Sequence, residues 1–153
     1  MLNSPQHLTV WQVFRITLWF GLVTGLLEVL ILFTQEHLFH QIIHRGRDYS
    51  WMTPLANMTI FAIFGSLPIL VAWRAPRFLP FPGLIFLFSF LAGINLALAF
   101  YQTGRTILLA AVGILAVGMA RLADSHPAAL HRLFTRTLPW LAAVVFLIAL
   151  GAR

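Results

Sequence analysis

The stretch VWQVFRITLWFGLVTGLLEVLILF, residues 10–33, decides the class of this protein, because Arg15 and Glu28 are its only charged side chains. A helix needs about 20 predominantly apolar residues to cross a bilayer core roughly 30 Å thick. Four more apolar stretches follow, at residues 54–73, 82–101, 106–122 and 138–150. The sequence therefore predicts an all-α integral membrane helical bundle with five transmembrane helices, forming a single membrane domain over residues 1–153.

The composition points to the same class. Hydrophobic residues make up 60% of the 153 residues and charged residues 9%, against about 45–50% and about 25% in soluble domains. The absence of cysteine excludes disulfide frameworks and thiolate metal sites. All ten basic residues are arginines, and in so apolar a chain their excess indicates orientation in a membrane. We therefore expect the lipid bilayer as a partner, and no nucleic acid.

The arginines predict which end of each helix faces the cytoplasm, because short cytoplasmic loops are enriched in basic residues. Six arginines fall on the side of the N-terminus and four on the other side. We expect a bacterial inner-membrane protein with a cytoplasmic N-terminus and a periplasmic C-terminus. The six are Arg15, Arg74, Arg77, Arg121, Arg132 and Arg136, and the four are Arg45, Arg47, Arg105 and Arg153.

Two segments between the spans have the pattern of short amphipathic helices lying on the membrane surface. Residues 35–44 place apolar side chains on one face and histidines on the other, and residues 127–137 combine an apolar stripe with Arg132 and Arg136. Basic amphipathic helices are attracted to anionic lipid headgroups. We expect one interfacial helix on each side of the bundle.

Glu28 is the most informative single residue, because an ionised carboxylate inside a span is costly without a partner. With alternating spans, Asn57 and Asn95 come to a similar depth, and Arg105 follows just above them. These four residues predict one polar cluster in the outer leaflet. The cluster would serve either as a proton or substrate site or as interhelical hydrogen bonding that holds the bundle together.

Residues Gly21 and Gly25 form a GxxxG pattern within the first span. Two small residues one turn apart let another helix approach closely. We expect this face to pack within the bundle, with a dimer seam as the alternative.

All six histidines lie outside the predicted spans, which argues against a haem held between two membrane-depth histidines. On a helix, His40 is spaced to share a metal ion with His37 or with His44. A third ligand would have to come from elsewhere, with Asp48 the nearest candidate. We read these histidines as the polar face of a surface helix, and we expect no metal and no cofactor.

Three stretches together resemble the multi-span N-terminal membrane region of some bacterial sulfatase-like hydrolases. They are GLVTGLLE at residues 21–28, RDYSWMTPLAN at residues 47–57 and RLFTRTLPWL at residues 132–141. The resemblance covers nearly the whole chain and implies a helical membrane part that precedes an outward-facing, metal-dependent hydrolase domain. The sequence has no Cys/Ser-x-Pro-x-Arg motif and no acidic metal cradle, so no catalytic residue carries over. We expect the membrane part alone, as a fragment or a stand-alone relative.

Three functional classes follow. The first is a non-catalytic membrane anchor or scaffold, either for a sulfatase-like domain or as an accessory subunit that binds a protein partner in a larger membrane complex. The second is a small oligomeric transporter or channel that uses the Glu28 cluster. The third is a membrane enzyme with a metal at the outer histidines. The prediction is the first class, and not an enzyme, because hydrophobic spans and packing are all that an anchor requires.

Overall fold

The computed structural model describes residues 8–38, 49–75, 79–99 and 105–151, and for residues 37, 38, 99 and 105–107 it describes the backbone. Within these ranges every regular element is a helix, and each of the five helices is long and apolar enough to cross a membrane. The prediction of an all-α, multi-pass membrane bundle is confirmed. The helices are α1 (Val10–Leu38), α2 (Tyr49–Arg74), α3 (Phe81–Ala99), α4 (Arg105–Ser125) and α5 (Pro127–Gly151).

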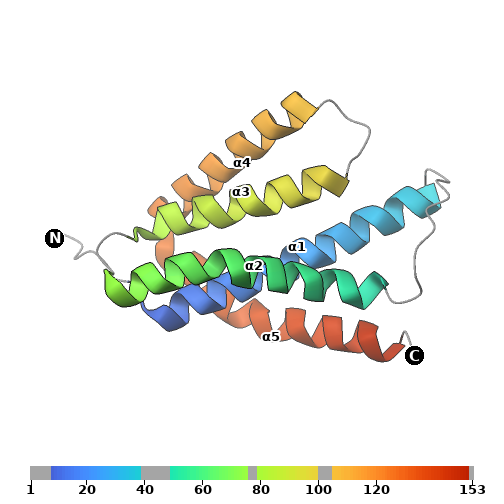
Figure 1. Cartoon of the computed structure of the whole chain (residues 1–153), viewed down its shortest axis with the longest axis horizontal. Coiled ribbons are helices and arrows are strands. Elements are labelled where there is room, and N and C mark those ends of the chain that lie inside the picture. The colour runs from blue at the N-terminus through green and yellow to red at the C-terminus, as the bar shows by residue number, and fades with distance from the viewer. Residues whose placement is uncertain (1–7, 39–48, 76–78, 100–104, 152–153) are drawn as a thin grey trace.

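Successive helices run in opposite directions (Figure 1). Helices α1 and α2 form the most extensive pair, α3 and α5 both pack on α1, and α4 packs mainly on α3. As a result the α3–α4 hairpin leans away from the rest of the bundle at the end where α4 begins (Figure 1).

Aromatic side chains at the centre of the molecule join four of the five helices. Phe61 of α2 is stacked on Phe20 of α1 with ring centroids 6.4 Å apart and lies 5.9 Å from Phe88 of α3. Phe134 of α5 closes the group, 6.0 Å from Phe20 and 4.7 Å from Trp19. Phe20, Phe61, Phe88 and Phe134 are all buried, so this aromatic cluster is the common packing centre of α1, α2, α3 and α5.

Local sequence explains where two of the helices begin. Thr9 and Gln12 form a capping box at the start of α1, in which each backbone N–H donates to the other residue's side chain, at 2.8 and 3.3 Å. A single residue, His126, separates α4 from α5. Pro127 then occupies the first position of α5, where its missing N–H would have no partner in any helix.

The structure corrects the bounds of the predicted surface helix over residues 127–137 and describes only part of the one over residues 35–44. Residues 127–137 are the first part of the continuous helix α5, and residues 35–38 are the last turn of α1; residues 39–44 lie outside the described residues. Pro139 does not end α5, because a proline removes only one helical hydrogen bond and neighbouring groups in a membrane bundle tolerate the change. The helix that contains the predicted fifth span, residues 138–150, is therefore 25 residues long.

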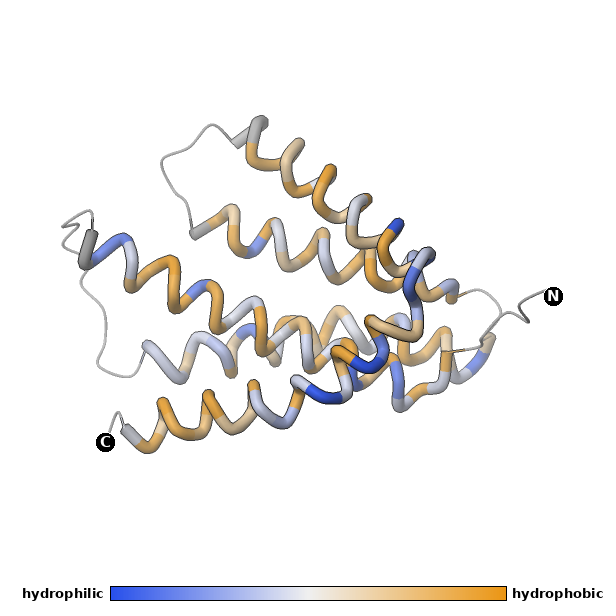
Figure 2. The backbone as a smooth tube through the Cα atoms, turned by 180° about the vertical axis from the view of Figure 1, so that it is seen from behind, coloured by the Kyte–Doolittle hydropathy of each residue, from blue (hydrophilic) through white to orange (hydrophobic). Residues whose placement is uncertain are grey.

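Helix α5 changes direction along its length. Its first part crosses the end of the bundle, and its second part runs beside α1 and α2 (Figures 1 and 2). The second span also starts earlier than predicted, at Tyr49 rather than at residue 54, with Pro54 inside the helix.

Positive charge gathers at the end of the bundle where α1 begins, which we call the basic end. Among the residues that the structure describes, five arginines lie there with one acid, Asp124, and all five are exposed. The hydrophilic segments near this end stand out in Figure 2. The acids of α1, Glu28 and Glu36, instead lie in its second half. The five arginines are Arg15, Arg74, Arg121, Arg132 and Arg136.

Candidate functional site

The candidate site is built on the close approach of α1 and α2. A Cβ atom added to Gly25 would lie 2.4 Å from the Cα of Pro54, and one added to Gly21 would lie 2.9 Å from the Cα of Met58. The two glycines therefore let the backbones touch, and the prediction that they pack within the bundle is confirmed. Glu28 follows three residues after Gly25, on the same side of α1, and so faces α2 where the helices are close.

Hydrogen bonds join three of the four predicted cluster residues. The side-chain amide Nδ2 of Asn57 donates to Glu28 Oε2 at 2.8 Å and to the backbone carbonyl of Thr53 at 3.1 Å. The Nδ2 of Asn95 donates in turn to Oδ1 of Asn57. The result is a directed chain of bonds that starts on α3, passes through α2 and ends at the carboxyl group of α1.

Burial differs along this chain of bonds. Asn57 is 3% exposed, whereas Glu28 and Asn95 are half-buried. A buried amide that lost its partner would leave donors and acceptors unsatisfied in an apolar surrounding, which costs about 1–3 kcal/mol. Asn57 is therefore the central member, and Glu28 is the end that stays accessible from outside the bundle.

The fourth predicted member, Arg105, is the first residue of α4. The structure describes its backbone, so its predicted place in the cluster remains a prediction.

One neighbouring residue was missed by sequence reasoning. Thr24 lies one helical turn before Glu28, is 1% exposed, and its hydroxyl has no hydrogen-bond partner among the described residues. The signal was present in the sequence, because positions four apart on a helix share a face. The set of chemical groups is thus one carboxyl, two amides and one hydroxyl, which can hold a proton or a small polar ligand but include no activated nucleophile.

Polar contacts between α1 and α5 form a second group toward the basic end. Trp19 Nε1 donates to Thr137 Oγ1 at 2.7 Å, and Gln12 Nε2 lies 3.0 Å from His131 Nε2. His131 was expected outside the spans, but it lies inside α5 because that helix begins at Pro127. These contacts hold the first part of α5 against α1.

The outer-loop histidines are not placed by the structure. His40, His44 and Asp48 lie outside the described residues, and His37 is described only as backbone. In the rest of the chain no three histidine, aspartate or glutamate side chains gather in a group that could hold a metal ion. The absence of a metal at these histidines remains a prediction.

Comparison of this chain with protein-family models, with curated proteins and with solved structures finds no match.

Proposed function

We propose that this protein is a non-catalytic integral membrane anchor or scaffold. The observation that supports this most directly is the bonding of Asn57, whose side chain accepts from Asn95 and donates to Glu28. Its polar atoms are used to tie three helices together, as expected of interhelical hydrogen bonding. The close packing of α1 on α2 serves the same end.

The scaffold would act in one of two settings. It is either the membrane part of a sulfatase-like protein, as the resemblance implies, or an accessory subunit bound to a protein partner within a larger membrane complex. In the second setting, gentle extraction from native membranes should yield the chain together with another polypeptide in a fixed molar ratio.

We further propose a bacterial inner-membrane location with the N-terminus in the cytoplasm and the C-terminus in the periplasm. The support is the basic end, where five exposed arginines lie beside the start of α1, because basic residues near helix ends favour the cytoplasmic side.

Reporter fusions test this orientation. Alkaline phosphatase, which is active only in the periplasm, should be active when fused after Arg153 and inactive when fused after Ser125, between α4 and α5. A fluorescent protein that matures only in the cytoplasm should give the reverse pattern. Equal phosphatase activity at both sites would mean that α5 does not cross, and the fully reversed pattern would overturn the orientation.

A transporter is the second candidate, and one observation favours it. Glu28 is half-buried, and one turn away lies the hydroxyl of Thr24, which has no hydrogen-bond partner within the described part of the chain. A carboxyl that can be reached from outside, one helical turn from such a hydroxyl, is suited to carry a proton or a polar substrate.

Glu28→Gln separates the two functions. If the chain is a scaffold, Glu28→Gln should stay folded. Vesicles containing the wild-type protein or Glu28→Gln should then show no proton flux above that of empty vesicles. Glu28→Ala should lose only about 0.6–2 kcal/mol of stability. The matched control is Glu36→Gln, an exposed acid on the same helix. Proton flux in the wild-type protein that persists in Glu36→Gln and disappears in Glu28→Gln would overturn the scaffold in favour of the transporter.

A further inference from the structure

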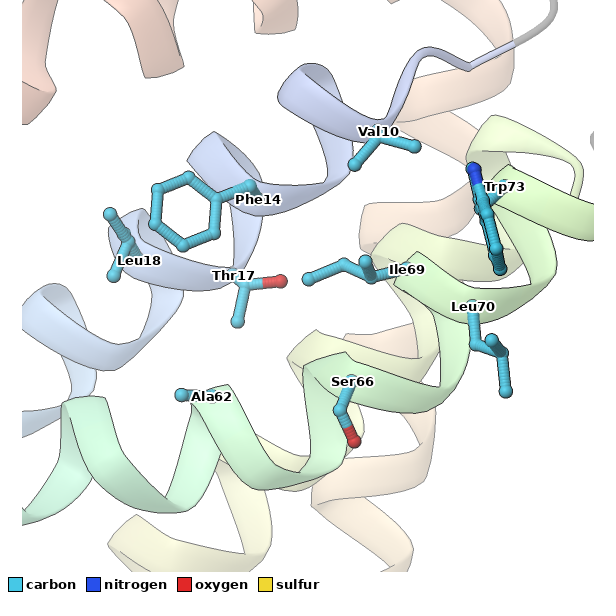
Figure 3. A pocket seen from close by; sticks show the side chains of 9 residues that line it. All are labelled: Val10, Phe14, Thr17, Leu18, Ala62, Ser66, Ile69, Leu70 and Trp73. Carbon is cyan, nitrogen blue, oxygen red and sulfur yellow. The ribbon is translucent and has the colours of Figure 1, made fainter.

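An apolar groove of about 310 Å³ runs between α1 and α2 on the outside of the bundle, at the basic end. Phe14 and Leu18 form its α1 wall, Ala62 and Ser66 its floor on α2, and Trp73 closes one end (Figure 3). Phe14 is 40% exposed and Trp73 67% exposed. The groove therefore opens toward the surroundings of the bundle, which in a membrane are lipid.

The groove offers no free polar group to a ligand, although two hydroxyls lie along it. Thr17 Oγ1 donates to the carbonyl of Val13 at 2.9 Å, and Ser66 Oγ donates to the carbonyl of Ile63 at 2.6 Å. Hydroxyls bonded back to their own helix leave an apolar surface. That surface suits a hydrocarbon chain and disfavours a polar metabolite.

Positive charge flanks the groove on both helices. The guanidinium carbon of Arg74 lies 5.2 Å from the centroid of the Trp73 ring, at the closed end. On α1, Arg15 directly follows Phe14 and is exposed. Helix α2 contains no acid, and the acids of α1 both lie in its second half. Two exposed arginines therefore lie near the groove, Arg74 beside its closed end and Arg15 next to Phe14 in the sequence.

We propose that this groove binds one acyl chain of an anionic phospholipid, with the lipid phosphate held by Arg74 and Arg15. Such a lipid has an anionic headgroup above an apolar tail, which matches the cations beside the apolar groove. Each arginine near the membrane surface contributes about 1 kcal/mol to binding an anionic lipid. A second copy of this chain fits less well. Two copies related by an axis along the membrane normal would place basic end beside basic end, and like charges repel.

Native mass spectrometry tests the proposal with phosphatidylglycerol and phosphatidylcholine of identical acyl chains. The wild-type protein should retain one phosphatidylglycerol in preference to phosphatidylcholine. Arg74→Gln should lower that preference about fivefold, the equivalent of about 1 kcal/mol. Ser66→Trp, which fills the groove, should abolish the retained lipid. Leu115→Trp, which adds the same ring on the exposed face of α4, should change nothing.

A second measurement compares the wild-type protein with Trp73→Phe and so does not depend on the folding of Ser66→Trp. Phosphatidylglycerol brominated on its acyl chains should quench tryptophan fluorescence more than brominated phosphatidylcholine, and Trp73→Phe should remove the difference. Equal quenching by the two lipids, equal retention of the two lipids, or a dimer that Ser66→Trp dissociates would each overturn the proposal.

Discussion

Replacing Phe61 with alanine should lower the free energy of unfolding by about 3 kcal/mol, at the low end of the range for truncating a buried phenylalanine. The side chain is fully buried and contacts the rings of Phe20 and Phe88, so its removal leaves a cavity where three helices meet. We expect the low end because the separated helices are still surrounded by lipid. The truncation therefore removes the free energy of packing contacts, and not a free energy of transfer from water.

Phe64→Ala is the matched control for this prediction. Phe64 lies three residues further along α2 and is 50% exposed, so it faces the surroundings of the bundle and its truncation leaves no cavity. Unfolding in mixed micelles, followed by circular dichroism, compares the two variants. Equal losses of stability would show that the aromatic cluster is not the packing centre.

Gly25→Ala should also destabilise the protein by about 3 kcal/mol, the upper end for overpacking. The new Cβ would lie 2.4 Å from the Cα of Pro54, and because that atom belongs to the backbone, one helix must move as a whole. Gly113→Ala is the control, since nothing lies within 4 Å of a Cβ there. It should keep or raise stability by up to about 1 kcal/mol through helix propensity.

The same displacement should weaken the polar cluster, because Glu28 lies three residues from Gly25 and bonds to α2. In a double-mutant cycle, Gly25→Ala and Glu28→Ala should therefore cost less together than the sum of their separate effects. Additive effects would contradict a link between the close approach and the Glu28–Asn57 bond.

The sequence was sufficient to predict the class, the five membrane-length helices and much of the candidate site. Uninterrupted apolar stretches identify membrane helices because lipid leaves no other partner for the backbone. Alternating direction then brings Glu28, Asn57 and Asn95 to one depth, and the structure joins them by hydrogen bonds. Depth alone does not determine which side of a helix meets which neighbour, so the direction of the bonds was not predicted.

The start of α5 was mispredicted for a physical reason. Arg132 and Arg136 lower the hydropathy before residue 138, so the segment has the composition of a surface helix. Long-range contacts keep it in one helix with the rest of α5, since Phe134 joins the aromatic cluster and Thr137 accepts a bond from Trp19. The groove beside Trp73 could not be predicted from the sequence either, because it depends on the shapes of side chains from two helices and not on a sequence pattern in one of them.

The order of the hydrogen-bond partners along the chain has a consequence for biosynthesis. Asn57 is made 29 residues after Glu28, and Asn95 another 38 residues later. At ribosomal rates of about 5–20 residues per second, Asn57 is made about 1.5–6 seconds after Glu28, so α1 exists for that time before its carboxyl group can meet either amide. Entry of α1 alone would expose that carboxyl to lipid, whereas entry of α1 and α2 as a hairpin brings Asn57 along. The position of Asn57 therefore favours insertion of α1 and α2 into the membrane as a pair.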